Sequence, residues 1–337
     1  MSKTITLSEL KNKILEIDNV LIIAHINPDP DTLGSALGLK WILKKLNKNA
    51  HIICATEPSE KSCGFLGITP ELDGIDPKTV PDNFDYIIAV DTASPGMLGR
   101  TFEKYNIDLV IDHHRTNNLF GQLTYLDPFA AATGEIIFDL AKELGIGFDI
   151  EFAKYIYCAL VCDSGSFKFS STTPKTLRIA ADLIETGLDF SKLNRLIFEN
   201  KSIEQLAVER LAYNSLKFCC GGRAGVINIT RSVKKEAGLE GCEIEGISGI
   251  AKVVAGVEVG ILIKETDGAK LENKNIREFK VSLRSNDYVD VAGIAAAFGG
   301  GGHTHAAGFK FTAEQSADNP DEDMIRQLLE KIESVLL

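Results

Sequence analysis

The sequence predicts an α/β protein with two domains. The first is an N-terminal doubly wound, mainly parallel sheet with helices on both faces, which a helical linker joins to a smaller α+β C-terminal domain. The length of 337 residues exceeds one ordinary domain. Continuous apolar strands alternate with helical patterns, which is typical of a parallel sheet covered on both faces. Near residue 217 the pattern changes to strands joined by hairpin-type turns.

The N-terminal elements follow from hydrophobic periodicity. Helical spacing of Leu7, Leu10, Ile14 and Ile17 predicts a first helix over 7–18. Uninterrupted apolar runs predict four buried strands, at 20–24, 50–55, 85–91 and 108–114. Apolar residues with helical spacing predict the other helices, at 32–47, 131–145, 149–162, 174–187 and, broken once, 189–217. The first domain is therefore expected at 1–190 and the helical linker at 191–216.

The C-terminal domain is expected at 217–337. Its strands are read in "FCCGGRAGVINI", "VEVGILIKE" and "EFKVSLRSN". Its helices are expected at 244–254, 289–298 and 320–336.

Composition narrows the class of protein. Lys plus Arg number 36 against 47 Asp plus Glu, a net charge of −11, which argues against a surface for long duplex nucleic acid. The N-terminus lacks the apolar region of a signal peptide, and no segment reaches the roughly 20 apolar residues that span a bilayer. The 7 cysteines include no C-x-x-C pair, which favours a reducing compartment. We expect a cytoplasmic protein that does not bind a membrane.

Acidic and histidine side chains follow the ends of four apolar elements. They are His25, Asp29, Asp31, Asp91, Asp112, His113, His114 and Asp163. The carboxyl ends of parallel strands meet at one edge of a sheet, where ligands bind. A single Asp at a strand end is usually a helix cap, but four such ends favour a shared site. Close carboxylates repel one another unless cations compensate them.

The same donor set indicates the kind of cation. Mixed Asp and His ligation without a thiolate favours Mn²⁺, with Mg²⁺ as the alternative. Two divalent cations roughly 3.5–4 Å apart would share one carboxylate and activate a water between them.

These residues carry a resemblance to a known family. "HINPDPDTLGS", "AVDTAS", "IDHHRTN" and "VCDSGSF" resemble, in order and spacing, the four motifs of the DHH phosphoesterases. "SLRSND" and "VAGIAAAFGGGGHTHAAGF" resemble the DHH-associated domain. The chain length and "FSSTTPKTLRIAADLIETG" are similar to the nanoRNase branch, bacterial oligoribonucleases that also dephosphorylate 3′-phosphoadenosine 5′-phosphate (pAp). The resemblance covers nearly the whole chain.

The resemblance implies a role for each residue of the cluster. His25 and Asp29 would hold one ion, with Asp91 bridging to the other. The second ion would be held by Asp31, His113 and Asp163. Asp112 would fix a histidine ring by a hydrogen bond, and His114 would face the substrate phosphate, so that His114, Asp91 and Asp112 form the catalytic set. Ser164 stands where the family commonly has threonine, and Ala132 where serine is frequent, while Thr133 and Glu135 remain.

The resemblance also implies a substrate site in the second domain. Arg284 would pair with a phosphate through its planar guanidinium. The run of four glycines would let the backbone approach the nucleotide closely. The full expected set is Arg284, Ser285, Gly299, Gly300, Gly301, Gly302 and His303. For His305, a substrate contact and a plain exposed side chain are equally compatible with the sequence.

The leading hypothesis is a metal-dependent phosphodiesterase that degrades oligoribonucleotides of about two to five nucleotides and dephosphorylates pAp, with base stacking contributing affinity. A phosphodiesterase for cyclic dinucleotides such as c-di-AMP, or for linear pApA or pGpG, is the main alternative. An inorganic pyrophosphatase is disfavoured by the glycine-rich loop. A nucleotide-binding regulatory module is disfavoured by the complete metal motifs. A homodimer is possible, with 131–145 as one apolar surface.

Overall fold

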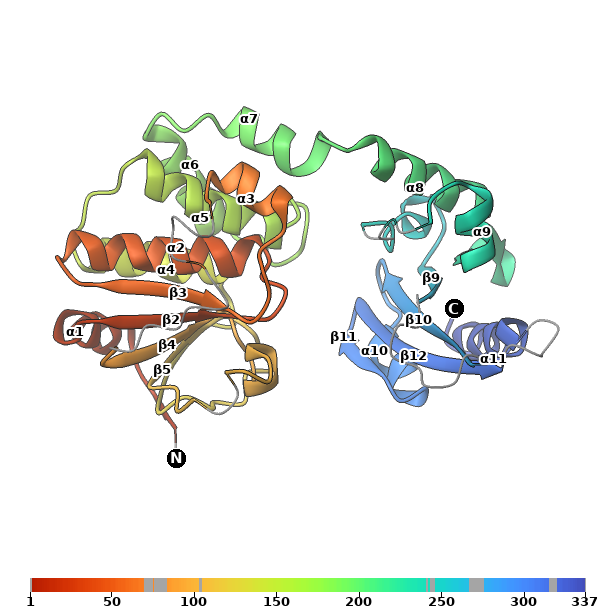
Figure 1. The fold of residues 1–337 in the computed structure, drawn as a ribbon, viewed down its shortest axis with the longest axis horizontal. Coiled ribbons are helices and arrows are strands. Elements are labelled where there is room, and N and C mark those ends of the chain that lie inside the picture. Colours follow the sequence, from red (N-terminus) through yellow and green to blue (C-terminus); the bar gives the residue numbers. More distant parts are fainter. Residues whose placement is uncertain are drawn as a thin grey trace. The chain divides into compact units, whose positions relative to one another are not determined.

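The computed structural model describes residues 2–69, 75, 84–102, 105–240, 242, 246–266, 276–314 and 320–336. The chain forms two compact units, Met1–Asn200 and Lys201–Leu337, each with its own sheet (Figure 1). The division falls inside the stretch expected as a helical linker. Helix α7 (Phe190–Asn194) and a π-helical turn (Arg195–Glu199) belong to the first unit, and α8 (Ile203–Ser215) belongs to the second.

The first unit is built on a six-stranded sheet in the order β1-β6-β5-β4-β2-β3. All of its strand pairs are parallel, as predicted. The strands are β1 (Lys3–Thr4), β2 (Val20–Ala24), β3 (Ala50–Cys54), β4 (Tyr86–Val90), β5 (Leu109–Asp112) and β6 (Leu123–Leu126). The short edge strand β1 and its neighbour β6 were not predicted, because neither is a continuous apolar run.

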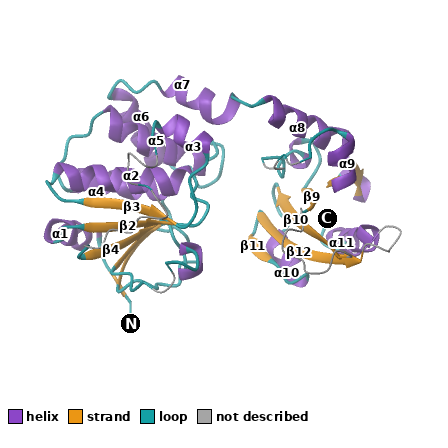
Figure 2. Cartoon of the chain, viewed as in Figure 1, coloured by secondary structure: helices purple, strands orange, loops and turns teal. Residues whose placement is uncertain are grey.

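Helices cover the two faces of this sheet unequally. The helices are α1 (Leu7–Glu16), α2 (Pro30–Lys45), α3 (Glu60–Leu66), α4 (Thr133–Glu143), α5 (Ile150–Asp163) and α6 (Pro174–Glu185). Apolar residues of α1, α2, α4 and α5 share one core with one face of the sheet. Figures 1 and 2 show α2, α4 and α5 on the same side of the strands. Across the described residues, the opposite face packs against the 3-10 helix Pro95–Leu98 and the turns after it, through Leu98 and Phe102.

Helix α4 was considered above as a dimer surface. Its apolar side chains Ile136, Ile137 and Leu140 are buried in the core of their own unit, so they are not available to a second chain.

A close contact between α2 and α5 helps to position the site. A Cβ placed on Gly34 of α2 would lie 2.4 Å from the backbone oxygen of Tyr155 in α5. Only glycine permits this approach. Asp31 lies in the first turn of α2 and Asp163 is the last residue of α5. The close packing therefore holds these two carboxylates at the same edge of the sheet.

Strand order explains why that edge carries a site. Strands β2 and β4 are neighbours, but the chain leaves β2 for β3 on one side and continues from β4 to β5 and β6 on the other. The gap between the carboxyl ends of β2 and β4 is thus the topological switch point, where open α/β sheets bind ligands. His25 directly follows β2, and Asp91 directly follows β4.

The second unit has a mixed sheet in the order β11-β12-β10-β9-β8-β7. The strands are β7 (Lys217–Cys219), β8 (Ala224–Ile229), β9 (Val259–Glu265), β10 (Ile276–Ser285), β11 (Gly301–His303) and β12 (Ala306–Glu314). Only β8 and β9 pair in parallel. Its helices besides α8 are α9 (Arg231–Glu236), α10 (Val291–Ala297) and α11 (Pro320–Glu333). Helices α10 and α11 pack on one face and α8 on the other.

The helix predicted at 244–254 is wrong over its described part, 246–254. That part contains only a 3-10 turn, Ala251–Val253. Ile247, Ile250 and Ala251 have helical spacing because they are buried together against α8. Gly246 has a positive φ of 73°, which no regular helix contains. In the described part of the chain, none of the helices has the length and apolarity required to cross a bilayer.

Candidate metal centre

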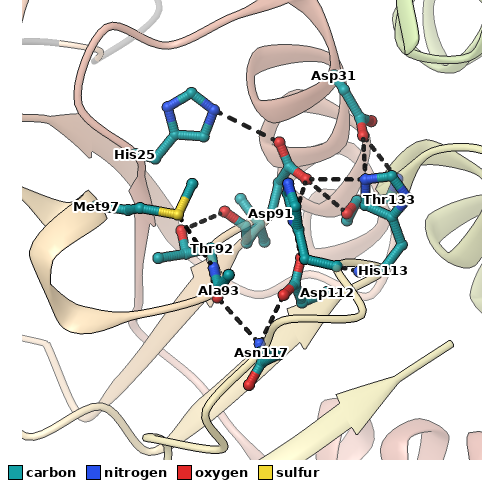
Figure 3. A network of polar contacts seen from close by, with 12 residues as sticks. His25, Asp31, Asp91, Thr92, Ala93, Met97, Asp112, His113, Asn117 and Thr133 are labelled. Carbon is teal, nitrogen blue, oxygen red and sulfur yellow. Dashed lines mark hydrogen bonds and ion pairs between the residues drawn. The ribbon is translucent and has the colours of Figure 1, made fainter. Parts of the chain in front are cut away.

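The structure brings the eight predicted side chains of the first unit together at the carboxyl edge of its sheet. Figure 3 shows five of them: His25, Asp31, Asp91, Asp112 and His113. Three groups of possible ligands have their donor atoms within 4.8 Å of one another. The groups are His25–Asp29–Asp91, Asp31–His113–Asp163 and Asp91–His113–His114. The first two correspond to the two ligand sets that the resemblance implies.

The donor spacing fits divalent cations. Nε2 of His25 lies 3.6 Å from a carboxylate oxygen of Asp29 and 3.6 Å from one of Asp91. Nε2 of His113 lies 3.3 Å from Asp163 and 3.8 Å from Asp31. Ligands about 2.1 Å from a common ion are at most about 4.2 Å apart. The residues present therefore fit the metals that the family implies, and their ligation stays a prediction.

The backbone orients both histidine rings toward the carboxylates. The carbonyl of Ile26 accepts from Nδ1 of His25 at 2.8 Å, and the carbonyl of Ala130 accepts from Nδ1 of His113 at 3.1 Å. A carbonyl only accepts, so Nδ1 carries the proton in both rings. In the neutral ring Nε2 then offers a lone pair to the centre, as metal-binding histidines do.

Asp91 lies at the middle of the cluster in a left-handed backbone conformation, with φ of 55°. Such a conformation is strained for a residue with a side chain and is common at functional sites. Its two oxygens accept from the hydroxyls of Thr32 and Thr133, the latter at 2.9 Å. These bonds fix the plane of a carboxylate that is 2% exposed.

Asp31 is held by the first turn of α4. Its oxygens accept from the amides of Thr133 at 2.7 Å and Gly134 at 2.9 Å, and from the Ser35 hydroxyl at 2.9 Å. The free amides of a helix N-terminus carry partial positive charge, which stabilises a carboxylate. Ala132, the departure from the family pattern, makes no side-chain cap at this terminus. Thr133 supplies the contacts instead.

Asp112 is fully buried and orients His114. One of its oxygens accepts from Nδ1 of His114 at 2.7 Å and from the amide of His113 at 2.8 Å. The other accepts from the Asn117 side chain at 2.6 Å. Nε2 of His114 is thereby left to face outward from a partly exposed ring.

The pKa values show that the aspartates of the cluster carry more negative charge than the protein alone compensates. Burial raises the pKa of Asp31 well above its usual value, and the charges of Asp91 and Asp163 add to the rise. Burial, with the charge of Asp91, raises the pKa of Asp163 to about 7. Burial acts to lower the pKa of His25, but hydrogen bonds to Asp29 and Asp91 raise it to about 10. Without cations, the cluster must take up protons.

Residues that hold the carboxylates were partly missed by sequence reasoning. Thr32, Ser35, Asn117 and the Gly134 amide all donate to Asp31, Asp91 or Asp112. The available signal was weak, because Thr32 simply follows Asp31 and Asn117 lies three residues after His114. Hydroxyl and amide groups near an acidic cluster are common without any role.

The predicted substrate residues of the second unit are placed as follows. Arg284 is half-buried on β10, where burial lowers its guanidinium pKa and Nη1 donates to the Leu283 carbonyl at 2.9 Å. It lines a cavity of about 250 Å³ with Lys264, Lys280 and Ser282, among others. Ser285 is only 1% exposed, and its hydroxyl lies 2.9 Å from Nδ1 of His305. His305 is thus exposed but tied to Ser285.

The four glycines of the expected loop are not equivalent. A Cβ on Gly300 would lie 2.2 Å from the Gly308 oxygen, and one on Gly302 would lie 2.5 Å from the Ala306 oxygen. Gly299 has a positive φ of 76°. The fold itself therefore requires glycine at these three positions. A Cβ on Gly301 would meet nothing within 4 Å, so this glycine is the one that a substrate contact would explain. The side chain of His303 lies outside the described residues.

Comparison with known proteins bears on both units. The model of the DHH family, N-terminal domain, matches residues 19–160, and the DHHA1 domain model matches residues 228–336. The bifunctional oligoribonuclease and PAP phosphatase NrnA of Thermus thermophilus is 32% identical over 292 residues, covering 86% of this chain and 83% of the relative. The protein of the same name from Bacillus subtilis is 28% identical over 315 residues, covering 92% and 95%.

A solved structure supports the fold. The crystal structure of an exopolyphosphatase-related protein from Bacteroides fragilis matches with a TM-score of 0.84 and 21% identity, covering 98% of this chain and 96% of that one.

Proposed function

Because the chain belongs to the DHH family, we propose that it is a metal-dependent phosphoesterase that hydrolyses very short oligoribonucleotides to mononucleotides and dephosphorylates pAp to AMP. The observation that carries the proposal is the partly buried cluster of aspartates and histidines at the switch point of the first sheet. The names of the Thermus thermophilus and Bacillus subtilis relatives, oligoribonuclease and PAP phosphatase, point to the same two substrates.

The two groups of donors would hold two divalent cations. His25 and Asp29 would bind one ion and Asp91 would bridge, with Mn²⁺ preferred and Mg²⁺ as the alternative. The second ion would be bound by Asp31, His113 and Asp163. When bound, the cations would polarise the phosphate and neutralise the charge that develops on it.

His114 would act on the substrate phosphate. Burial acts to lower its pKa, but the hydrogen bond to Asp112 and the charge of Asp91 raise the pKa to about 9. Asp112 accepts from Nδ1, so Nε2 would present its proton to the substrate phosphate. His114 would there hydrogen-bond a phosphate oxygen or give its proton to the leaving oxygen.

The cavity of the second unit supports binding of phosphate groups. Lys264 and Lys280 occupy directly paired positions on β9 and β10, and Arg284 lies on the same cavity wall. Several cationic side chains on one cavity wall give a positive potential, which favours an anion. We propose that this cavity receives a phosphate of the substrate.

The proposal also covers the length of the substrate and the compartment in which the protein acts. The acidic balance of the chain favours short single strands over long duplexes. The cysteine pattern favours a reducing compartment, and we propose the cytoplasm.

The experiment supplies Mn²⁺ to the purified protein and follows pAp, dinucleotides and RNAs of increasing length up to a few dozen nucleotides. We expect rapid turnover of pAp and the shortest RNAs, and loss of both activities in D91A and in the double variant H113A/H114A. Degradation of the long RNAs alone would contradict the proposal. Faster turnover of c-di-AMP than of pApA would move the assignment to cyclic dinucleotides.

A matched comparison tests the cavity. K280Q removes one charge from its wall, whereas K331Q removes one from α11. We expect K280Q to raise KM for short RNA and K331Q to leave it unchanged. Equal KM values for both variants and the wild type would contradict phosphate binding there.

A further inference from the structure

Two side chains beside the metal centre are not used by the chemistry above. Arg115 directly follows the His113–His114 pair in the chain. Phe129 directly precedes Ala130, whose carbonyl accepts from Nδ1 of His113 at 3.1 Å. Each of the two is therefore within two residues of a group that forms or orients the centre.

The exposure of Phe129 is unusual. Its side chain is 76% exposed, more than that of any other large aromatic residue in the part of the chain that the structure describes. Burial of this ring would stabilise the folded state by about 25 cal/mol for each Å² removed from water, and the exposed position forgoes that gain. An aromatic ring left exposed beside a catalytic centre is therefore a candidate for contact with substrate.

Phe129 is presented by a firmly held turn. The Asp127 side chain accepts from the Phe129 amide at 3.1 Å, and the Asp127 carbonyl accepts from the Ala130 amide at 3.2 Å. The Asp127 amide donates to the carbonyl of Asp112, which orients His114. Pro128 restricts the backbone further. The backbone that carries the ring is thus fixed relative to the histidines, which lowers the ordering needed when a ligand binds.

Arg115 supports the ring from the other segment. Its guanidinium carbon lies 5.7 Å from the centroid of Phe129, and Nε donates to the Pro128 carbonyl at 3.4 Å. A guanidinium over an aromatic face is attracted to it, and both planar groups stack well on nucleobases. The pair offers a flat, partly cationic surface next to the phosphate site.

We propose that Phe129 and Arg115 form the stacking platform for the base of the nucleotide whose phosphate lies at the metal centre. This inference rests on the proposed function and adds to it the position of one base. Stacking on an aromatic ring accepts every base, because each has a π face. The platform therefore favours nucleotides over phosphate esters without a base, and does not select a base sequence.

The test compares pApA with the corresponding dinucleotide lacking both bases, in the wild type and in F129A, F129L and F129W. We expect F129A to raise KM for pApA between about fivefold and about 150-fold, as loss of one stacked base predicts. F129L keeps apolar bulk but not a flat ring, so KM should also rise, and F129W should restore it. The kcat for pApA and the KM for the abasic substrate should not change.

A control separates this role from a general effect of surface apolar residues. Ile150 is 52% exposed at the N-terminal end of α5, about 20 Å along that helix from Asp163. I150A should leave both KM values as in the wild type.

The inference is wrong if F129A hydrolyses pApA with the wild-type KM, or if KM rises equally for the abasic substrate. It is also wrong if F129A instead lowers kcat and the amount of metal that the protein binds, because Phe129 would then act by positioning Ala130 and His113. If the wild type itself fails to hydrolyse pApA, the proposed function and this inference are both wrong. If the wild type hydrolyses pApA but F129A behaves as described above, only the inference is wrong.

Discussion

Replacement of Asp91 by Asn tests the electrostatic reasoning most directly. The change keeps the shape of the side chain and removes the charge that lies 3.6 Å from His25 and 3.7 Å from both His113 and His114. The neutral amide is a poor bridge between two cations, so both proposed metal positions should weaken together.

The magnitude follows from ligand linkage. A ligand at 100 times its Kd stabilises the folded state by about 2.7 kcal/mol. For a domain of this size, that corresponds to a rise in Tm of about 5–10 °C. We expect Mn²⁺ to raise the Tm of the first unit by this amount in the wild type and to leave that of D91N nearly unchanged.

The stability of the metal-free protein should also change in D91N. The rise in the pKa of His25 from 6.5 to about 10 corresponds to on the order of 5 kcal/mol, which Asp29 and Asp91 share. D91N should therefore destabilise the metal-free protein by on the order of 2 kcal/mol at neutral pH. Because the pKa is raised by folding, this contribution is complete below about pH 6.5 and is lost as the pH rises through 10.

The assay is thermal unfolding after treatment with a chelator, with and without added Mn²⁺. D182N is the matched control, because Asp182 lies on the surface of the same unit and pairs with Lys142 at 2.7 Å. Loss of such an exposed pair changes stability by at most about 1 kcal/mol and should leave the metal effect intact. A full metal-induced shift in D91N would refute the reasoning.

Three further outcomes are expected. Titration of the metal-free protein with MnCl₂ at pH 8 in weak buffer should release protons, because the pKa of His25 is raised and this proposed ligand must lose a proton to bind metal; no release would contradict the assignment. G34A should destabilise the first unit by about 1–3 kcal/mol in urea unfolding, because its Cβ would overlap a backbone oxygen, whereas G64A, with open space, should not. E265Q should destabilise the second unit by about 2 kcal/mol, because Glu265 accepts two arginine N–H bonds at 3.0 Å. Burial acts to raise the pKa of Glu265, but the arginine contacts lower it overall. The stability difference between E265Q and the wild type should therefore vanish as the pH falls below about 4.5, where Glu265 becomes protonated. An equal difference at all pH values would contradict this reasoning.

Local sequence features predicted the first unit well. The apolar runs gave strand β2 at its observed bounds and β3, β4 and β5 to within two residues at each end. These strands are buried on both faces, so nearly every position is apolar and the run has clear ends. The helix predicted at 244–254 failed because Ile247, Ile250 and Ala251 share a helical spacing that arises from burial alone.

The sequence by itself determined which Asp and His residues follow the ends of the buried strands. Both the length of an apolar run and the residues after it can be read from neighbouring positions in the chain. The sequence did not determine how each carboxylate oxygen is held. Asp31 and Asp91 both receive bonds from Thr133, a residue 102 and 42 positions away. Only strand order and the packing of α2, α4 and α5 bring those groups within hydrogen-bond distance, because such contacts depend on the path of the whole chain.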